Sequence, residues 1–152
     1  MSEPHPNSEF VSKSAGDLAA QGFPRMPGYV LMALMASDEG RLTASDLAEQ
    51  LEVSPAAISN AVGYLTTLGF IRTETVPGSR RHVYALPDVP WYTVTLGRPR
   101  YAHMATLVRA AAQSLPAGSA ALGRVEQMAD FYDFIGERMP RLFAEWRDRS
   151  QP

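Results

Sequence analysis

The sequence contains no cysteine, which excludes disulfide bonds, thiolate catalysis and cysteine-ligated zinc sites. It also lacks an apolar run of the roughly 20 residues that a membrane-spanning helix needs. Its first residues, MSEPHPNSEF, have neither the basic start nor the apolar stretch of a signal peptide. Neither sign of charge dominates, because the formal net charge of the 152 residues is −2. We therefore expect a cytoplasmic protein that does not contact a membrane and does not coat nucleic acid by bulk charge. A local basic patch would still allow it to bind DNA.

The patterns of catalytic and cofactor sites are also missing. There is no phosphate-binding loop, no dinucleotide fingerprint and no G-x-S-x-G motif, and the three histidines lack metal-ligand spacing. Four carboxylates share one flank of a predicted helix, namely Glu126, Asp130, Asp133 and Glu137. A solvated flank explains them better than a metal site, because the Glu-x-x-His pairs of di-iron bundles are absent. We expect no enzyme activity, no metal and no cofactor.

The periodicity along the chain predicts a mainly α-helical protein with one small β-hairpin. The expected elements are a helix over 8–21, a proline-containing break, a buried helix over 29–37, two short helices within 43–68, two strands around a turn at Pro77-Gly78, a proline-rich connector, and helices over 100–114 and 120–149. These elements suggest three parts: an N-terminal tail and helix over 1–22, a central domain over 23–90 that ends with the hairpin, and a connector with two helices over 91–152.

The segment TASDLAEQLEVSPAAISNAVGYLTTLGF carries the signals for two short helices held at a fixed angle. Thr43 is a good N-cap, and Asp46 three residues later completes a capping box. Ser54 is the next N-cap, with Pro55 at the first helical position, where its missing N–H costs nothing. An apolar residue precedes each cap and can pack on the fourth helical residue. Gly69 suits a left-handed position at the end of the second helix. The short joint between the helices predicts a helix-turn-helix.

The second of these helices has no charged side chain and divides into two faces. Ile58, Leu65 and Leu68, with Val62 or Ala61, should face the core. The outer face is small and polar, with Ser59 and Asn60 at its centre and Tyr64 towards its edge. Such a slim face can enter the DNA major groove, where an asparagine can pair with adenine.

The hairpin after this helix supplies the missing positive charge. PGSRRH places Arg80, Arg81 and His82 at a tight turn, with Arg72 on the preceding strand. Arginines on a projecting hairpin can reach phosphates or a narrow minor groove. The order of these parts predicts a winged helix-turn-helix, which makes 23–90 the predicted DNA-binding domain, with dimerisation helices expected in 1–22 and 91–152. The predicted DNA-binding residues are Ser54, Pro55, Ala56, Ser59, Asn60, Tyr64, Arg72, Arg80, Arg81 and His82.

The last predicted helix carries apolar residues at alternating spacings of three and four, which favours a partner helix along its length. The helix over 100–114 is too short to cover this stripe, so we expect a homodimer. The predicted dimer interface comprises Phe10, Leu18, Val125, Met128, Tyr132, Ile135, Met139, Leu142 and Trp146. Pro140 lies within the stripe and should kink the helix or begin a new turn there.

The region from LTASDLAEQLEVSP to RRHVYAL resembles the winged helix-turn-helix of MarR-type transcriptional regulators. Gly22, Arg25 and Gly28 upstream match a G-x-x-R-x-x-G stretch of the GbsR-like branch. The resemblance implies a recognition helix over 54–68, a wing over about 73–84, and a homodimer that represses or activates transcription. It also implies that a small effector can bind between the dimerisation helices and the winged domain. Candidate residues for that pocket are Met32, Met35, Trp91, Tyr92, Tyr101 and Met104, which are more often plain core.

Two other functions are compatible with the sequence. The family's recognition helix often carries lysine or arginine, and its absence here favours a winged helix that binds another protein and never contacts DNA. A dimerisation domain of a larger enzyme is less favoured, because the chain is too short to add a catalytic fold. The main prediction remains a homodimeric DNA-binding regulator that recognises a palindrome-like site.

Overall fold

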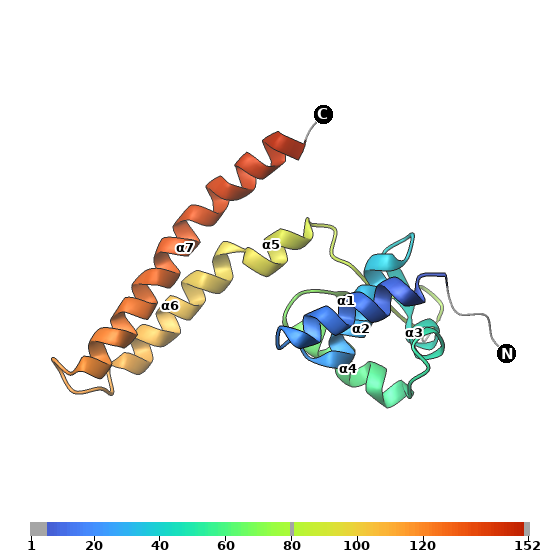
Figure 1. The fold of residues 1–152 in the computed structure, drawn as a ribbon, viewed down its shortest axis with the longest axis horizontal. Helices are drawn as coiled ribbons and strands as arrows, with labels where there is room; N and C mark the ends of the chain where they lie inside the picture. Colours follow the sequence, from blue (N-terminus) through green and yellow to red (C-terminus); the bar gives the residue numbers. More distant parts are fainter. Residues whose placement is uncertain (1–5, 80, 151–152) are drawn as a thin grey trace. The chain divides into compact units, whose positions relative to one another are not determined.

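The computed structural model describes residues 6–79 and 81–150 of the chain (Figure 1). The chain divides into two compact units, which we call the N-terminal unit (Met1–Trp91) and the C-terminal unit (Tyr92–Pro152). Each unit has its own packed helices. The fold class is the predicted one, mainly α-helical with a small antiparallel sheet.

The N-terminal unit packs four helices against a three-stranded sheet. Its elements are α1 (Ser8–Ala20), α2 (Arg25–Ala36), β1 (Arg41–Thr43), α3 (Ala44–Gln50), α4 (Pro55–Thr67), β2 (Arg72–Thr75) and β3 (His82–Ala85). The strands pair antiparallel in the order β1-β3-β2. The most deeply buried large side chains come from α2, α3 and α4, and they are Val30, Leu34, Leu47, Ile58 and Leu65. The predicted inner face of α4 therefore does form the core.

The predicted helix ends of this unit are confirmed by their hydrogen bonds. The backbone N–H of Asp46 donates to Thr43 Oγ1 at 3.1 Å, and the N–H of Thr43 donates to Asp46 Oδ2 at 2.9 Å. Ser54 Oγ accepts from the N–H of Ala57 at 3.2 Å. Gly69 has a φ of +77°, and the N–H of Phe70 donates to the carbonyl of Leu65 at 2.9 Å. Both helices of the motif therefore begin and end where their capping residues stand.

Three elements differ from the prediction. α2 begins at Arg25 and includes Pro27, because a proline in the first helical turn loses no backbone hydrogen bond. β1 was not predicted, since its three residues are recognisable only by their pairing with β3. The expected proline-rich connector contains a short helix, α5 (Trp91–Leu96), which crosses the boundary between the units.

The C-terminal unit is built on a hairpin of α6 (Arg98–Ala112) and α7 (Ala120–Ser150), which lie side by side (Figure 1). Small side chains are buried along the hairpin and allow the two helices to approach closely, namely Ala105, Ala112, Ala129 and Gly136. α7 runs unbroken across Pro140, so no new helix turn starts there. A proline removes one backbone hydrogen bond, and the long helix keeps those of the turns before and after it. No helix in the described residues is long and apolar enough to span a membrane.

Candidate nucleic-acid interface

A tight joint fixes the angle between α3 and α4. The N–H of Val53 donates to the carbonyl of Ala48 at 3.0 Å, which closes α3. Glu52 adopts a left-handed conformation with a φ of +54°, and this turns the chain towards Ser54. Because α4 starts at the next residue, Pro55, the two helices form the compact motif that the sequence predicts.

The outer face of α4 is exposed and carries no charge. The residues predicted to enter a major groove all lie on this exposed side, namely Ser54, Pro55, Ala56, Ser59 and Asn60. A Cβ atom added at Gly63 would meet nothing within 4 Å, so the surface is smooth beyond Asn60. Tyr64 is 39% exposed and packs edge-to-face on Phe23, with ring centroids 5.9 Å apart. The contact with Phe23 holds the tyrosine at the edge of this face.

The predicted hairpin turn is present between β2 and β3. Gly78 has a φ of +77°, and the N–H of Ser79 donates to the carbonyl of Val76 at 3.0 Å. The N–H of Arg81 donates to Ser79 Oγ at 3.1 Å. The side chains of Arg81 and His82 are exposed, whereas Arg80 lies outside the described residues. The hairpin therefore presents at least one cationic side chain to solvent.

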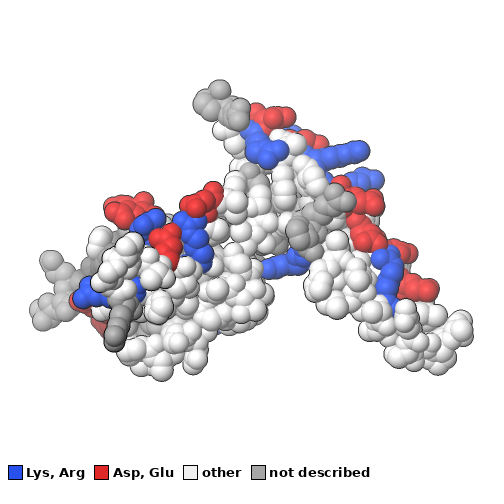
Figure 2. All heavy atoms as spheres, turned by 180° about the vertical axis from the view of Figure 1, so that it is seen from behind, with Lys and Arg blue, Asp and Glu red and all other residues white. Residues whose placement is uncertain are grey.

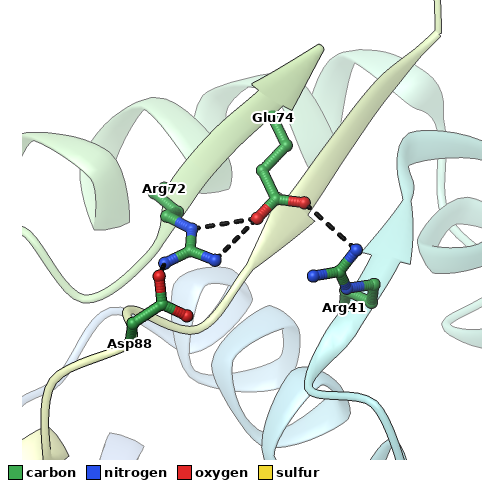
Figure 3. A network of polar contacts seen from close by, with 4 residues as sticks. All are labelled: Arg41, Arg72, Glu74 and Asp88. Atoms are coloured by element: carbon green, nitrogen blue, oxygen red, sulfur yellow. Dashed lines mark hydrogen bonds and ion pairs between the residues drawn. The ribbon is translucent and has the colours of Figure 1, made fainter. Parts of the chain in front are cut away.

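Arg72 is held by carboxylates of its own unit (Figure 3). Its Nε and Nη2 donate to Glu74 Oε1 at 3.0 and 2.7 Å, and its Nη1 contacts Asp88. Arg41 Nη1 lies 3.4 Å from Glu74 Oε2. The hydrogen bond from Arg72 lowers the pKa of the Asp88 carboxyl, and the two carboxylates raise the pKa of Arg72. A phosphate would therefore have to compete with these two carboxylates for the guanidinium group of Arg72.

Charges of opposite sign lie next to one another on much of the face in Figure 2, with uncharged areas between them. On the hairpin of the C-terminal unit, Arg109 bridges α6 to α7 by pairing with Asp130 at 2.8 Å and with Asp133 at 2.6 Å. These two aspartates belong to the carboxylate flank of α7 that is predicted from the sequence to be solvated. No group of three potential metal ligands occurs in the described part of the chain.

The predicted dimer residues fall into two sets. Half-buried ones include Leu18, Val125, Ile135, Met139 and Tyr132, and the Tyr132 ring lies 6.3 Å from that of Tyr101 on α6. Exposed ones are Phe10, Met128, Leu142 and Trp146.

The dimer interface predicted from the sequence did not include two exposed aromatic residues of α7. Phe131 is 57% exposed and Phe134 is 48% exposed. Their spacing of three from Met128 was a usable signal, because it continues one side of the helix from that exposed methionine. Together with Met128, Leu142 and Trp146 they form what we call the α7 apolar face.

The predicted effector residues belong to different units. Met32 is half-buried and Met35 exposed in α2, whereas Tyr101 and Met104 lie on α6. The side chains of Trp91 and Tyr92 fall outside the described ones. The grouping of these residues in one pocket stays a prediction.

The helix-turn-helix, the following hairpin and the three-stranded sheet define a winged helix-turn-helix protein. Two family models match adjacent parts of the sequence: one described as MarR family covers residues 21–82, and one described as MmpR5-like MarR family transcriptional regulator covers residues 90–149. The chain is therefore similar to MarR family proteins over these two segments, and its fold is that of a winged helix-turn-helix protein.

The chain is also similar to individual proteins. The chain is 32% identical over 78 residues to the HTH-type transcriptional regulator MmpR5 of Mycobacterium tuberculosis, a match that covers 51% of this chain and 47% of that protein. It thus spans about half the length of the curated relative that it matches. A crystal structure described as a transcriptional regulator has a TM-score of 0.81 and 23% identity, covering 94% of this chain and 99% of the other. AbsC, a MarR family transcriptional regulator from Streptomyces coelicolor, is 20% identical with a TM-score of 0.44, covering 95% of this chain and 88% of AbsC.

Proposed function

We propose that the protein is a sequence-specific DNA-binding transcriptional regulator of the MarR type. The observation that carries the proposal is the exposed, slim and uncharged face of α4 next to an arginine-bearing hairpin. A helix enters the major groove only when its leading side chains are small enough to fit. The similarity to MmpR5 over part of the chain supports the same function.

In this proposal the two elements have separate tasks. Ser54, Ala56, Ser59 and Asn60 read base edges in the major groove, and Pro55 and Tyr64 pack against the groove walls. Arg81 binds phosphate or enters the minor groove, with His82 beside it and Arg80 as the second predicted cation. Because α4 itself has no charge, the hairpin must provide the electrostatic part of the affinity.

This division of tasks can be tested with two single substitutions. Arg81→Ala should weaken binding to all duplexes alike and should make the slope of log affinity against log salt shallower by about 0.9 for each phosphate that is no longer neutralised. Asn60→Ala should instead reduce discrimination between the selected site and other sequences, with the slope unchanged. Fluorescence anisotropy at several salt concentrations measures both effects on a site selected from random duplexes. Equal losses on all sequences for Asn60→Ala would contradict the base-reading role.

We further propose that the protein acts as a homodimer on a palindrome-like site. The exposed α7 apolar face and the exposed Phe10 support this, because a helix rarely leaves several large apolar side chains in water without a partner. A two-fold dimer would place two α4 helices about 34–36 Å apart, one turn of DNA. A small-molecule effector and the GbsR-like branch remain predictions from the resemblance, and a cytoplasmic location remains a prediction from the composition.

A winged helix that binds another protein is the second candidate function, and the chargeless α4 favours it. Gel-shift experiments with a random duplex pool discriminate between the two. If the purified 152-residue protein retains no duplex at low salt, this result excludes the regulator and favours the interaction module.

A further inference from the structure

Three charged residues lie on the outer face of the sheet. Antiparallel pairing places Arg72 and Arg41 on either side of Ala85, and Glu74 opposite Val83. Side chains of directly paired residues share a face, so both arginines and Glu74 project from the same side. Tyr84 projects from the other side, where it joins the core. Figure 3 shows Glu74 between the two guanidinium groups, with Asp88 beyond Arg72.

The two carboxylates that hold Arg72 differ in their exposure. The side chain of Glu74 is 27% exposed and shared by two arginines. That of Asp88 is 84% exposed and forms its ion pair with Arg72, while Arg41 attracts it more weakly. Asp88 stands three residues after β3, where the N–H of Leu86 donates to the carbonyl of Gly40 at 2.8 Å and holds the chain beside β1. Water screens an exposed pair and competes for both partners. The Arg72–Asp88 pair is therefore the exchangeable part of the network, and the Glu74 pairs are the fixed part.

We propose that Asp88 occupies the place of a DNA phosphate on Arg72 and so limits the affinity of the protein for DNA. A guanidinium group binds carboxylate and phosphate oxygens with the same geometry. Glu74 keeps the Arg72 side chain oriented while the N–H groups on Nη1 pass from Asp88 to a phosphate. Asp88 is a positioning and competing residue, and it does not contact DNA itself. The inference rests on the proposed function, since it needs a duplex as the partner.

The charge balance of residues 23–90, which hold the helix-turn-helix and the hairpin, makes this competition consequential. Residues 23–90 contain five arginines and seven carboxylates, a net charge of 5 − 7 = −2. Each cation that can leave its internal partner therefore matters for association with a polyanion.

The test compares Asp88→Asn with Asp38→Asn, measured by anisotropy on the selected duplex. Both variants remove one exposed carboxylate from the same unit, and no ion pair of Asp38 occurs within the described residues. The asparagine at 88 keeps an acceptor of the same size, so the fold should persist. Release of Arg72 predicts an affinity gain beyond that of Asp38→Asn, up to about eightfold per subunit at 0.1 M salt, with a slope steeper by about 0.9 for each additional phosphate bound.

The same comparison in an Arg72→Gln background separates the pair from a general charge effect. The extra gain of Asp88→Asn should vanish there, and Asp88→Glu, which retains the charge, should bind like the unchanged protein. Equal gains from Asp88→Asn and Asp38→Asn, or a gain that survives Arg72→Gln, would overturn the proposal while leaving DNA binding intact. Failure of the unchanged protein to bind any duplex would reject the proposed function itself and this inference with it. Thermal unfolding followed by circular dichroism verifies that the variants are folded.

Discussion

At the scale of single residues, Glu52 holds an unfavourable backbone conformation in the joint of the helix-turn-helix. Its φ of +54° lies in the left-handed region, which costs an L-residue about 1–2 kcal/mol. The side chain is exposed, so its removal loses no packing. Glu52→Gly relieves the strain, and the greater freedom of glycine in the unfolded chain offsets part of the gain. We expect the free energy of unfolding to rise by about 0.5–1 kcal/mol, as measured by urea denaturation.

The matched control for this prediction is Glu49→Gly, three residues earlier. Glu49 is equally acidic and exposed, but it lies within α3. Glycine there should lower the free energy of unfolding by up to about 1 kcal/mol, because it weakens the helix. A loss of stability in both variants would show that the left-handed conformation at position 52 is not a source of strain.

At the scale of elements, the sequence predicted those parts whose signals are local. Thr43 and Ser54 each cap a helix within three residues, so the starts of α3 and α4 could be recognised without any tertiary structure. β1 could not, because its strand character comes from pairs such as Leu42 with Tyr84, more than forty residues away. Local propensity carries no information about such a pairing.

The same distinction applies to the candidate site. The exposure of Ser59 and Asn60 follows from the helical periodicity of α4, so the sequence sufficed. The ion pair between Arg72 and Asp88 could not be predicted. Asp88 is sixteen residues from Arg72 along the chain, and the two side chains meet only after the sheet has formed. Glu74, two residues from Arg72 along the same strand, was the one available hint.

Gly63 allows stability and function to be separated within α4. It is exposed in the helix, and an added Cβ atom would meet nothing within 4 Å. Gly63→Ala should therefore stabilise the protein by about 1 kcal/mol. We also expect it to weaken DNA binding, because the new methyl group stands one turn beyond Ser59 and Asn60 on the face proposed to enter the groove. Urea denaturation and anisotropy measure the two quantities on the same sample.

Gly16→Ala is the control, since Gly16 is also an exposed helical glycine with an open Cβ position, but it lies on α1. It should give a similar gain in stability with unchanged DNA affinity. If both variants bind DNA like the unchanged protein, the duplex does not approach α4 closely at position 63, and the proposed docking of this helix would need revision.

At the scale of the whole molecule, the C-terminal unit buries one part of the apolar pattern of α7 and leaves another part exposed to solvent. Ala129 and Gly136 are buried in the hairpin, where Tyr132 packs beside Tyr101 of α6. Phe131 and Leu142 remain about half exposed on α7. Burial of a phenylalanine or leucine side chain contributes about 1.5–3 kcal/mol. A second copy of the chain that covers these residues would gain this contribution twice, once from each subunit.

Phe131→Glu should therefore dissociate the proposed homodimer. A symmetric interface loses two phenylalanines and gains two carboxylates, a change of at least about 3 kcal/mol or roughly a hundredfold in the dissociation constant. Sedimentation equilibrium at micromolar concentration should give twice the chain mass for the unchanged protein and the single-chain mass for the variant. Ala110→Glu adds the same charge at an exposed alanine of α6, one helical turn from Thr106 and Gln113, and should stay dimeric.

DNA affinity should fall with the loss of the dimer in Phe131→Glu alone, because each subunit contributes one α4 to a two-part site. A monomeric unchanged protein that still binds a palindromic duplex tightly would contradict this assembly.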